Sequence, residues 1–302
     1  MTKWQKIAGS LCGVAVGDAL GATLEFMTKK EITEKFGLHT EMIGEGYWKL
    51  FPGEVTDDTD MTIAVAKGIL TDPEDPVVHI ARFFADWARS DPKDIGNICR
   101  LALAEGIRRG TVSEAEWLEV SEFAHLQSGG RSGGNGSLMR TIPVVLAYYT
   151  DRDRMLQMAY RQSALTHYDP AAGKCVMLYC DLVRRLIEGE DLRTGIRETA
   201  EEYRDGFKFR VDLPPEEIKT TGYVVHTLEA ALNCAFQTQS FEEAVIMAVN
   251  LGGDTDTIGA VTGGIAGACY GLDQIPPRWL GKLAVRDELL DLADSLYRIN
   301  NT

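Results

Sequence analysis

Two acidic stretches contain the residues most suited to chemistry. The first, VTDDTDMT, covers residues 55–62, and the second, GGDTDTIGAVTGGIAGA, covers residues 252–268. Each places aspartate and threonine just before an apolar run of helical character. Carboxylate and hydroxyl oxygens are ligands that Mg²⁺, Mn²⁺ and Ca²⁺ prefer, whereas zinc favours histidine and cysteine. The sequence therefore predicts two helix starts that carry ligands for a hard divalent cation.

Helix capping is the alternative interpretation of both stretches, because aspartate and threonine commonly occupy the N-cap and complement the positive end of the helix dipole. Both stretches hold more acidic residues than a cap requires, and they resemble one another: DDTDMTIAVAKGI at 57–69 is matched by GDTDTIGAVTGGI at 253–265. Two ions about 3.5–4 Å apart, bridged by one carboxylate, would use this number of acidic ligands. The spacing of an EF-hand is missing. A metal site is therefore the favoured interpretation.

A glycine-rich stretch, SGGRSGGNGSLMR at residues 128–140, is a candidate phosphate-binding loop. Glycine lets backbone N–H groups approach phosphate oxygens closely. The alternative is a flexible surface loop, which the glycine content alone would favour. Asn135 and Arg140 support the binding loop, but the residues alone leave both interpretations open.

Helices must position these residues, since apolar side chains recur three and four places apart at 7–15, 80–87 and 224–235. FKFRVDL at 207–213 is the best strand candidate, and it is short. The predicted fold is therefore all-α, with one multi-helix domain over residues 1–302. Capping-box spacing and glycine stops support the helices at Ser113 with Glu116, Ser240 with Glu243, Gly110 and Gly189.

The helix predicted after the second acidic stretch has a glycine every four residues, at Gly259, Gly263 and Gly267. Each glycine costs about 1 kcal/mol relative to alanine inside a helix. Close approach of another helix would compensate for this cost. The pattern predicts a central, tightly packed helix that holds Asp254 and Asp256 rigidly.

Composition excludes several classes of protein. The chain has 302 residues, of which 45% are hydrophobic and 25% charged, and its net charge is −14. An acidic chain is unsuited to nucleic-acid binding. No apolar run reaches the roughly 18–20 residues of a membrane span. Six cysteines without a CxxC pair indicate free buried thiols. We expect a cytoplasmic protein that is a monomer and binds neither nucleic acid nor membrane.

Taken together, the motifs resemble those of the ADP-ribosylglycohydrolase family from about residue 5 to about residue 280. The resemblance rests on GVAVGDALGATLEF at 13–26 and on the two acidic stretches, in this order and spacing. DPKDIGN, GGNGSLMR, LTHYDP and GYVVHTLEAAL, which begin at residues 91, 133, 165 and 222, are most similar to bacterial members that reactivate dinitrogenase reductase. The resemblance implies an all-α fold with a cleft that holds two Mg²⁺ or Mn²⁺ ions.

The resemblance also implies the residues of the site. Asp256 would bridge the two ions, and Asp60 falls at a position outside the ligand set. The implied metal ligands are Thr56, Asp57, Asp58, Asp254, Asp256 and Thr257. The implied catalytic residues are Glu25, Asp94 and Asp256. The residues implied to bind ADP-ribose are Gly133, Gly134, Asn135, Gly136, Ser137, His167 and Tyr223.

The implied reaction is hydrolysis of the bond between ADP-ribose and a protein side chain, typically arginine, with dinitrogenase reductase as a candidate substrate. Cleavage at the anomeric carbon builds oxocarbenium-like charge, for which paired carboxylates are the usual device. Glu25 and Asp94 both suit the basic guanidine leaving group, and the residues do not fix their order of use. Alternatives are hydrolysis of a serine linkage or of O-acetyl-ADP-ribose, and a non-catalytic ADP-ribose-binding protein.

Overall fold

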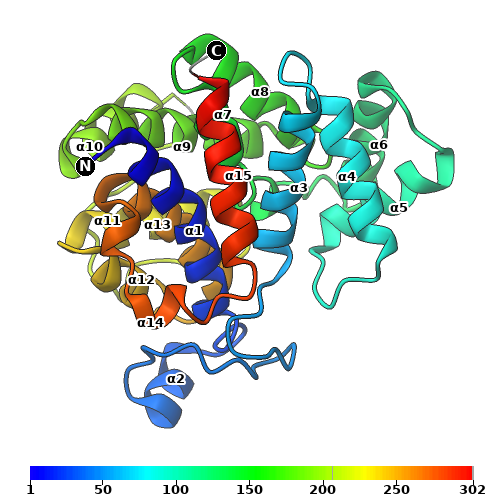
Figure 1. The fold of residues 1–302 in the computed structure, drawn as a ribbon. Coiled ribbons are helices and arrows are strands. Elements are labelled where there is room, and N and C mark those ends of the chain that lie inside the picture. The colour runs from blue at the N-terminus through cyan, green and yellow to red at the C-terminus, as the bar shows by residue number, and fades with distance from the viewer. Residues whose placement is uncertain (206, 301–302) are drawn as a thin grey trace.

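A computed structural model describes residues 1–205 and 207–300. At its centre, helix α1 (Lys3–Gly21) lies antiparallel to helix α13 (Thr255–Tyr270) (Figure 1). The two backbones touch at glycines: a Cβ on Gly13 would lie 2.2 Å from the Gly263 carbonyl oxygen, and one on Gly17 would lie 2.0 Å from that of Gly259. The glycine spacing in α13 therefore has the structural meaning predicted for it, a close contact with another helix.

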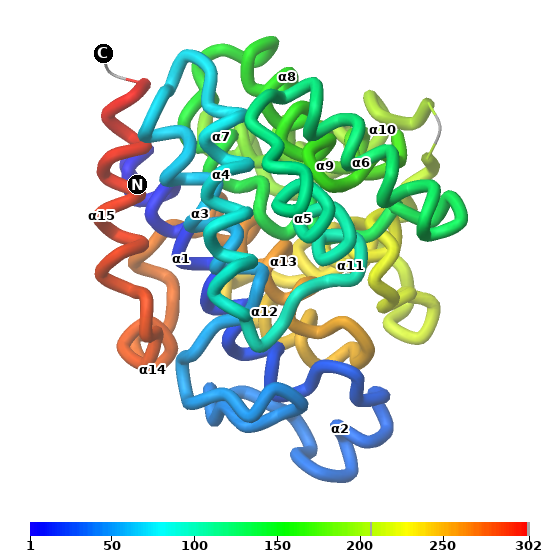
Figure 2. The backbone as a smooth tube through the Cα atoms, turned by 90° about the vertical axis from the view of Figure 1, so that its right-hand side faces the viewer, coloured from blue at the N-terminus to red at the C-terminus, as the bar shows by residue number. Residues whose placement is uncertain are grey.

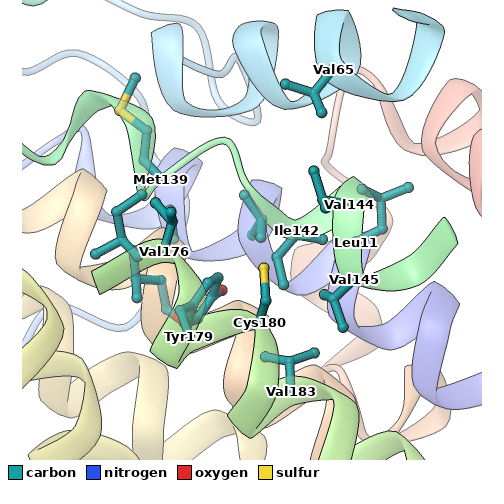
Figure 3. Packing of buried hydrophobic residues seen from close by; sticks show 14 of the residues in the cluster. Leu11, Val65, Met139, Ile142, Val144, Val145, Val176, Tyr179, Cys180 and Val183 are labelled. Carbon is teal, nitrogen blue, oxygen red and sulfur yellow. The ribbon is translucent and has the colours of Figure 1, made fainter. Parts of the chain in front are cut away.

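The other helices surround this pair. Helix α15 runs beside α1, and α3 pairs with α4 on the side that carries α5 and α6. Helices α7 to α10 lie along the top of the molecule in Figure 1, where α7 contacts α3 and α8 contacts α4. Leu11 of α1, Val65 of α3, Val144 of α7 and Val183 of α9 share one buried apolar cluster (Figure 3). The remaining helices are α2 Lys29–Phe36, α3 Asp57–Thr71, α4 Val77–Arg89, α5 Asn97–Arg109, α6 Glu114–Gln127, α7 Ile142–Tyr148, α8 Arg152–Ala164, α9 Pro170–Glu188, α10 Leu192–Glu202, α11 Val224–Gln237, α12 Phe241–Val249, α14 Pro277–Leu280 and α15 Arg286–Ile299, with short 3₁₀ helices at Asn135–Ser137 and Leu272–Gln274.

A lobe of residues 22–56 connects α1 to α3 and contains α2. It projects from the lower edge of the helical body in both views (Figures 1 and 2). The C-terminal end of α1 lies next to the start of α3, where Asp18 accepts from the N–H of Thr56. The lobe therefore leaves and rejoins the helical body beside the acidic helix starts. The cleft described below therefore has the lobe along one edge.

The all-α prediction is confirmed, since the described residues contain isolated bridges but no strand. The strand suggested at 207–213 is wrong. Side chains of α11 take the place of a neighbouring strand, since Glu229 accepts from the N–H of Arg210 at 2.8 Å and Asn233 from that of Leu213 at 2.7 Å. Asp212, with a φ of +69°, also interrupts any regular extended run. Phe207, Phe209 and Val211 are half-buried against the main apolar cluster of the protein.

The predicted local signals agree with the structure in most cases. Ser113 and Glu116 form a full capping box, and Gly110 and Gly189 end α5 and α9 in the left-handed conformation. At α12, Ser240 accepts from the N–H of Glu243, but the Glu243 carboxylate accepts from Gln239 instead of closing the box. All six cysteines are free, and no described helix is long and apolar enough to cross a membrane.

Candidate active site

The two acidic helix starts meet at one cavity of about 430 Å³. The N-termini of α3 and α13 approach it from the centre of the body, and the loop before α5 and the turn after α1 close its sides. The predicted site residues in its wall are Glu25, Asp57, Asp94, Gly134, Asn135, Gly136, His167, Asp254, Asp256 and Thr257. Segments separated by about two hundred residues of sequence thus form one site.

The N-cap side chains of the two acidic helix starts do not cap their helices. Thr56 and Asp254 occupy the N-cap positions of α3 and α13, yet neither side chain makes a capping hydrogen bond to the first turn of its own helix. The Thr56 hydroxyl donates to Asp18 at 2.9 Å, and the Asp254 carboxylate accepts from the Asn135 amide at 2.8 Å. Capping therefore does not account for the side chains of Thr56 and Asp254, whereas the Asp256 carboxylate accepts from the Thr257 N–H at 2.9 Å in the first turn of α13.

Asp18 is a residue that sequence reasoning missed. It lies within α1, is fully buried, and accepts hydrogen bonds from the backbone N–H groups of Thr56 and Thr59, each at 3.1 Å, and from both hydroxyls. These bonds fix the start of α3 against α1. The one available signal was an acidic residue in the middle of a buried, glycine-rich helix.

Glu25, Asp94 and Asp256 converge in the cavity, where each offers a carboxylate oxygen within 4.8 Å of the others. Burial disfavours the charged form of each group. It raises the pKa of Glu25 to about 8 and that of Asp94 to about 9, with the neighbouring carboxylates adding to both shifts. The pKa of Asp256 is raised well above its usual value for the same two reasons. This corner can hold a proton near neutral pH.

The donor set beneath this corner fits divalent cations. Asp58 is buried, and its Oδ1 has no hydrogen-bond partner, while its Oδ2 accepts from the Thr257 hydroxyl at 3.2 Å. Burial raises the pKa of Asp57 to about 6, although the Gly96 N–H donates to its carboxylate at 3.1 Å. A buried carboxylate oxygen without a partner is costly. A cation among these residues would supply the missing positive charge.

The part of the cavity wall formed by Gly134, Asn135, Gly136 and His167 is polar but uncharged, although Arg100 also lines the cavity. His167 is buried, its Nδ1 lies 2.8 Å from the Thr166 hydroxyl, and burial lowers its pKa to about 3, so the ring is neutral. Gly134 and Gly136 lie against this ring, because a Cβ on either would fall within 3.5 Å of it. The wall can therefore donate and accept hydrogen bonds without adding charge.

Three of the predicted substrate residues and Arg140 lie outside this wall. Ser137 is fully buried and bonds to Ser163, and Gly133 lies behind the loop against the Tyr223 ring. Tyr223 is 39% exposed on the outer side of that loop. Arg140, taken as support for phosphate binding, is fully buried and held by side chains and backbone of the protein, with its guanidinium 4.2 Å from the Phe84 ring centre.

The metal-free protein is expected to become more stable as the pH falls from about 9 to about 6. Folding raises the pKa of Asp57, Glu25 and Asp94 to about 6, 8 and 9. A raised folded-state pKa stabilises the folded protein fully below the unfolded pKa, and this contribution is lost as the pH rises through the folded value. The midpoint temperature of thermal unfolding in chelator should therefore be several degrees higher at about pH 6 than at about pH 9.

Added Mg²⁺ or Mn²⁺ should flatten that dependence, because a bound cation compensates the charges that the protons otherwise neutralise. The same unfolding series with the metal present provides the comparison. If the unfolding midpoint in chelator is the same at about pH 9 and about pH 6, folding does not raise the pKa values of these carboxyl groups as expected.

Comparison with known proteins agrees with this geometry. The family model for ADP-ribosylglycohydrolase matches residues 2–302. The chain is 36% identical to the ADP-ribosyl-(dinitrogen reductase) glycohydrolase of Rhodospirillum rubrum, over 93% of this chain and 90% of that protein. It is 30% identical to the ADP-ribosylarginine hydrolase Tri1 of Serratia proteamaculans, over 97% and 79% of the two chains.

A solved structure described as an ADP-ribosylglycohydrolase-related protein complex superposes with a TM-score of 0.80 at 34% identity, covering 98% of both chains. A helical fold with buried carboxylates at its central cleft thus defines an enzyme of the glycohydrolase class. The chain belongs to the ADP-ribosylglycohydrolase family.

Proposed function

We propose that this enzyme hydrolyses the N-glycosidic bond between ADP-ribose and an arginine side chain of a protein. The observation that carries the proposal is the convergence of Glu25, Asp94 and Asp256 within 4.8 Å of one another, beside two helix starts whose N-cap side chains make no capping hydrogen bond. Paired carboxylates are what cleavage at an anomeric carbon requires. The names of the relatives in Rhodospirillum and Serratia support the ADP-ribosylated protein and the arginine linkage.

The metal ligands of the proposed centre are those the sequence implied. When bound, two Mg²⁺ or Mn²⁺ ions supply Lewis-acid polarisation of the ribose oxygens and of a water molecule. Burial and the neighbouring carboxylates raise the pKa of Asp58 and of Asp256 well above the usual value. A bound cation would therefore stabilise the charged forms of these two residues most. The set is Thr56, Asp57, Asp58, Asp254, Asp256 and Thr257.

Glu25 and Asp94 are the candidates for proton transfer. Guanidine is strongly basic, so it leaves as the protonated form, and a carboxyl group with a raised pKa can carry that proton at neutral pH. Trp48 donates its indole N–H to Glu25 at 2.5 Å, which orients this carboxyl group toward the cavity. Asp94 lies on the other side of the corner and has no such partner among the bonds described.

The nucleotide part of the substrate would lie along the uncharged part of the wall. Gly134, Gly136 and the neutral ring of His167 line the cavity there, while the Asn135 N–H donates to the Gly222 carbonyl. An anionic diphosphate is disfavoured next to the carboxylates and favoured at a glycine loop. Residues 1–302 would act as one domain and as a monomer, since the site is assembled from a single chain.

Product analysis tests the proposal. Arginine-linked and serine-linked ADP-ribosylated substrates are incubated in chelator, with Mg²⁺ and with Mn²⁺. Free ADP-ribose from the arginine substrate, released only with metal, is the expected result. Release of AMP would indicate cleavage of the pyrophosphate, and exclusive action on the serine substrate would overturn the linkage.

A further inference from the structure

Three aromatic side chains form an exposed cluster at the mouth of the cavity. Phe26 and Tyr47 are 61% and 66% exposed, and Trp48 is half-buried beside them. The ring centres of Phe26 and Tyr47 are 5.0 Å apart and those of Tyr47 and Trp48 4.7 Å apart, both in edge-to-face geometry. Phe26 and Trp48 also line the cavity. These three residues are called the aromatic lip.

The backbone at Phe26 makes its exposure more unusual. Its φ is +66°, a left-handed conformation that is unfavourable for a bulky residue and that glycine or asparagine adopts more easily. Burial of the ring does not compensate for this unfavourable backbone conformation, because most of the side chain faces solvent. A residue that is disfavoured both by its backbone conformation and by its exposure is typical of a functional position.

The lip borders the reacting corner. Phe26 directly follows Glu25 in the chain, and Trp48 donates to the Glu25 carboxyl group. The uncharged wall with Gly134, Gly136 and His167 belongs to other segments of the cavity wall. The proposed function requires that ADP-ribose occupies that wall. The modified side chain and the protein that carries it must then extend out of the cavity at another place. The lip adjoins the carboxylates at which the bond is cleaved, so it lies at a suitable exit.

We propose that the aromatic lip is the docking surface for the polypeptide that carries the ADP-ribosylated side chain. The proposal rests on the proposed function and names the part of the substrate that the cavity does not hold. Exposed aromatic rings are the residues that contribute most to protein interfaces.

The lip is connected to the ligands of the site through the backbone. The Phe26 N–H donates to the Gly253 carbonyl at 2.9 Å, and the Gly253 N–H donates to the Met27 carbonyl at 2.8 Å. Gly253 immediately precedes Asp254. A protein seated on the lip would therefore lie against the same turn that fixes the start of α13.

The test compares two substrates in steady-state kinetics, an ADP-ribosylated protein and free ADP-ribosylarginine. Tyr47→Ala and Phe26→Asn should each lower the ratio of kcat/KM for the protein to kcat/KM for the small substrate about tenfold, which is more than most interface residues contribute. Leu38→Ala is the matched control. Leu38 lies in the same lobe and is also 61% exposed, but it is not part of the cavity wall. Its ratio should stay at the wild-type value.

Thermal unfolding separates a docking role from a structural one. Asparagine tolerates the left-handed conformation, so Phe26→Asn should unfold at a temperature no lower than the wild-type protein while it loses activity on the protein substrate. Wild-type ratios in both lip variants would overturn the docking surface and leave the proposed function intact. A wild-type enzyme that releases ADP-ribose from neither substrate would overturn both.

Discussion

Replacing Asp256 with asparagine is expected to lower the rate of ADP-ribose release on the order of a thousandfold and to weaken Mn²⁺ binding. The Asp256 carboxylate is buried where Glu25, Asp94 and the start of α3 meet. Asparagine keeps its size and removes its charge. Single-turnover release of ADP-ribose and calorimetric titration with Mn²⁺ measure the two effects.

The metal-free Asp256→Asn protein should also be more stable than the wild type, because one of several mutually repelling carboxylates is gone. Asp60→Asn is the control: Asp60 lies in the same acidic stretch of α3, but its carboxylate accepts from the Trp87 indole at 3.0 Å outside the cavity wall. It should retain activity and Mn²⁺ affinity. Wild-type Mn²⁺ affinity in Asp256→Asn would contradict the metal centre.

The second large effect is expected from Gly263→Ala, which should destabilise the fold by about 3 kcal/mol or more. The added Cβ would lie 2.0 Å from the Gly13 carbonyl oxygen, and both atoms belong to central helices that cannot move independently. Urea-induced unfolding measures the change in the free energy of unfolding. Activity per folded molecule should also fall, because separating α1 from α13 displaces Asp18 and Asp254.

Gly195→Ala is the matched control for this prediction. Gly195 lies inside α10, where the new Cβ would have its nearest neighbour at an ordinary 3.4 Å from a Leu182 methyl group. Alanine is favoured over glycine in a helix by about 1 kcal/mol, so this variant should be slightly more stable than the wild type. Equal effects of the two substitutions would show that the close helix contact is unimportant.

The sequence predicted the helical class and the acidic half of the site because both depend on local patterns. Asp57 and Asp254 each precede an apolar run, and the glycine spacing of α13 indicates a close neighbour without naming it. Glu25 and Asp94 were found only through the family motifs. The structure brings all four to one cavity, which no pattern within a single stretch could show.

The features that escaped prediction depend on partners distant in sequence. Asp18 acts on Thr56, 38 positions away, and Arg140 is held by Gln162 and Thr166 in another helix and its end. The segment at 207–213 resembled a strand because an alternating pattern does not tell whether a neighbouring strand or side chains will accept its backbone N–H groups. The exposure of Phe26 has no sequence signature, since its motif reads as apolar.

The pairing of α1 with α13 also has a consequence for synthesis of the protein. Ser10 donates to the Gly264 carbonyl, 254 positions further along the chain. The glycine face of α1 has no partner until the ribosome has released nearly the whole chain, because contacts of this separation form late. Until α13 has been synthesised, the glycine-rich apolar face of α1 is not covered by this partner and is available for binding by a chaperone. The acidic pocket, which needs residues from both ends, cannot collect metal ions on an unfinished chain.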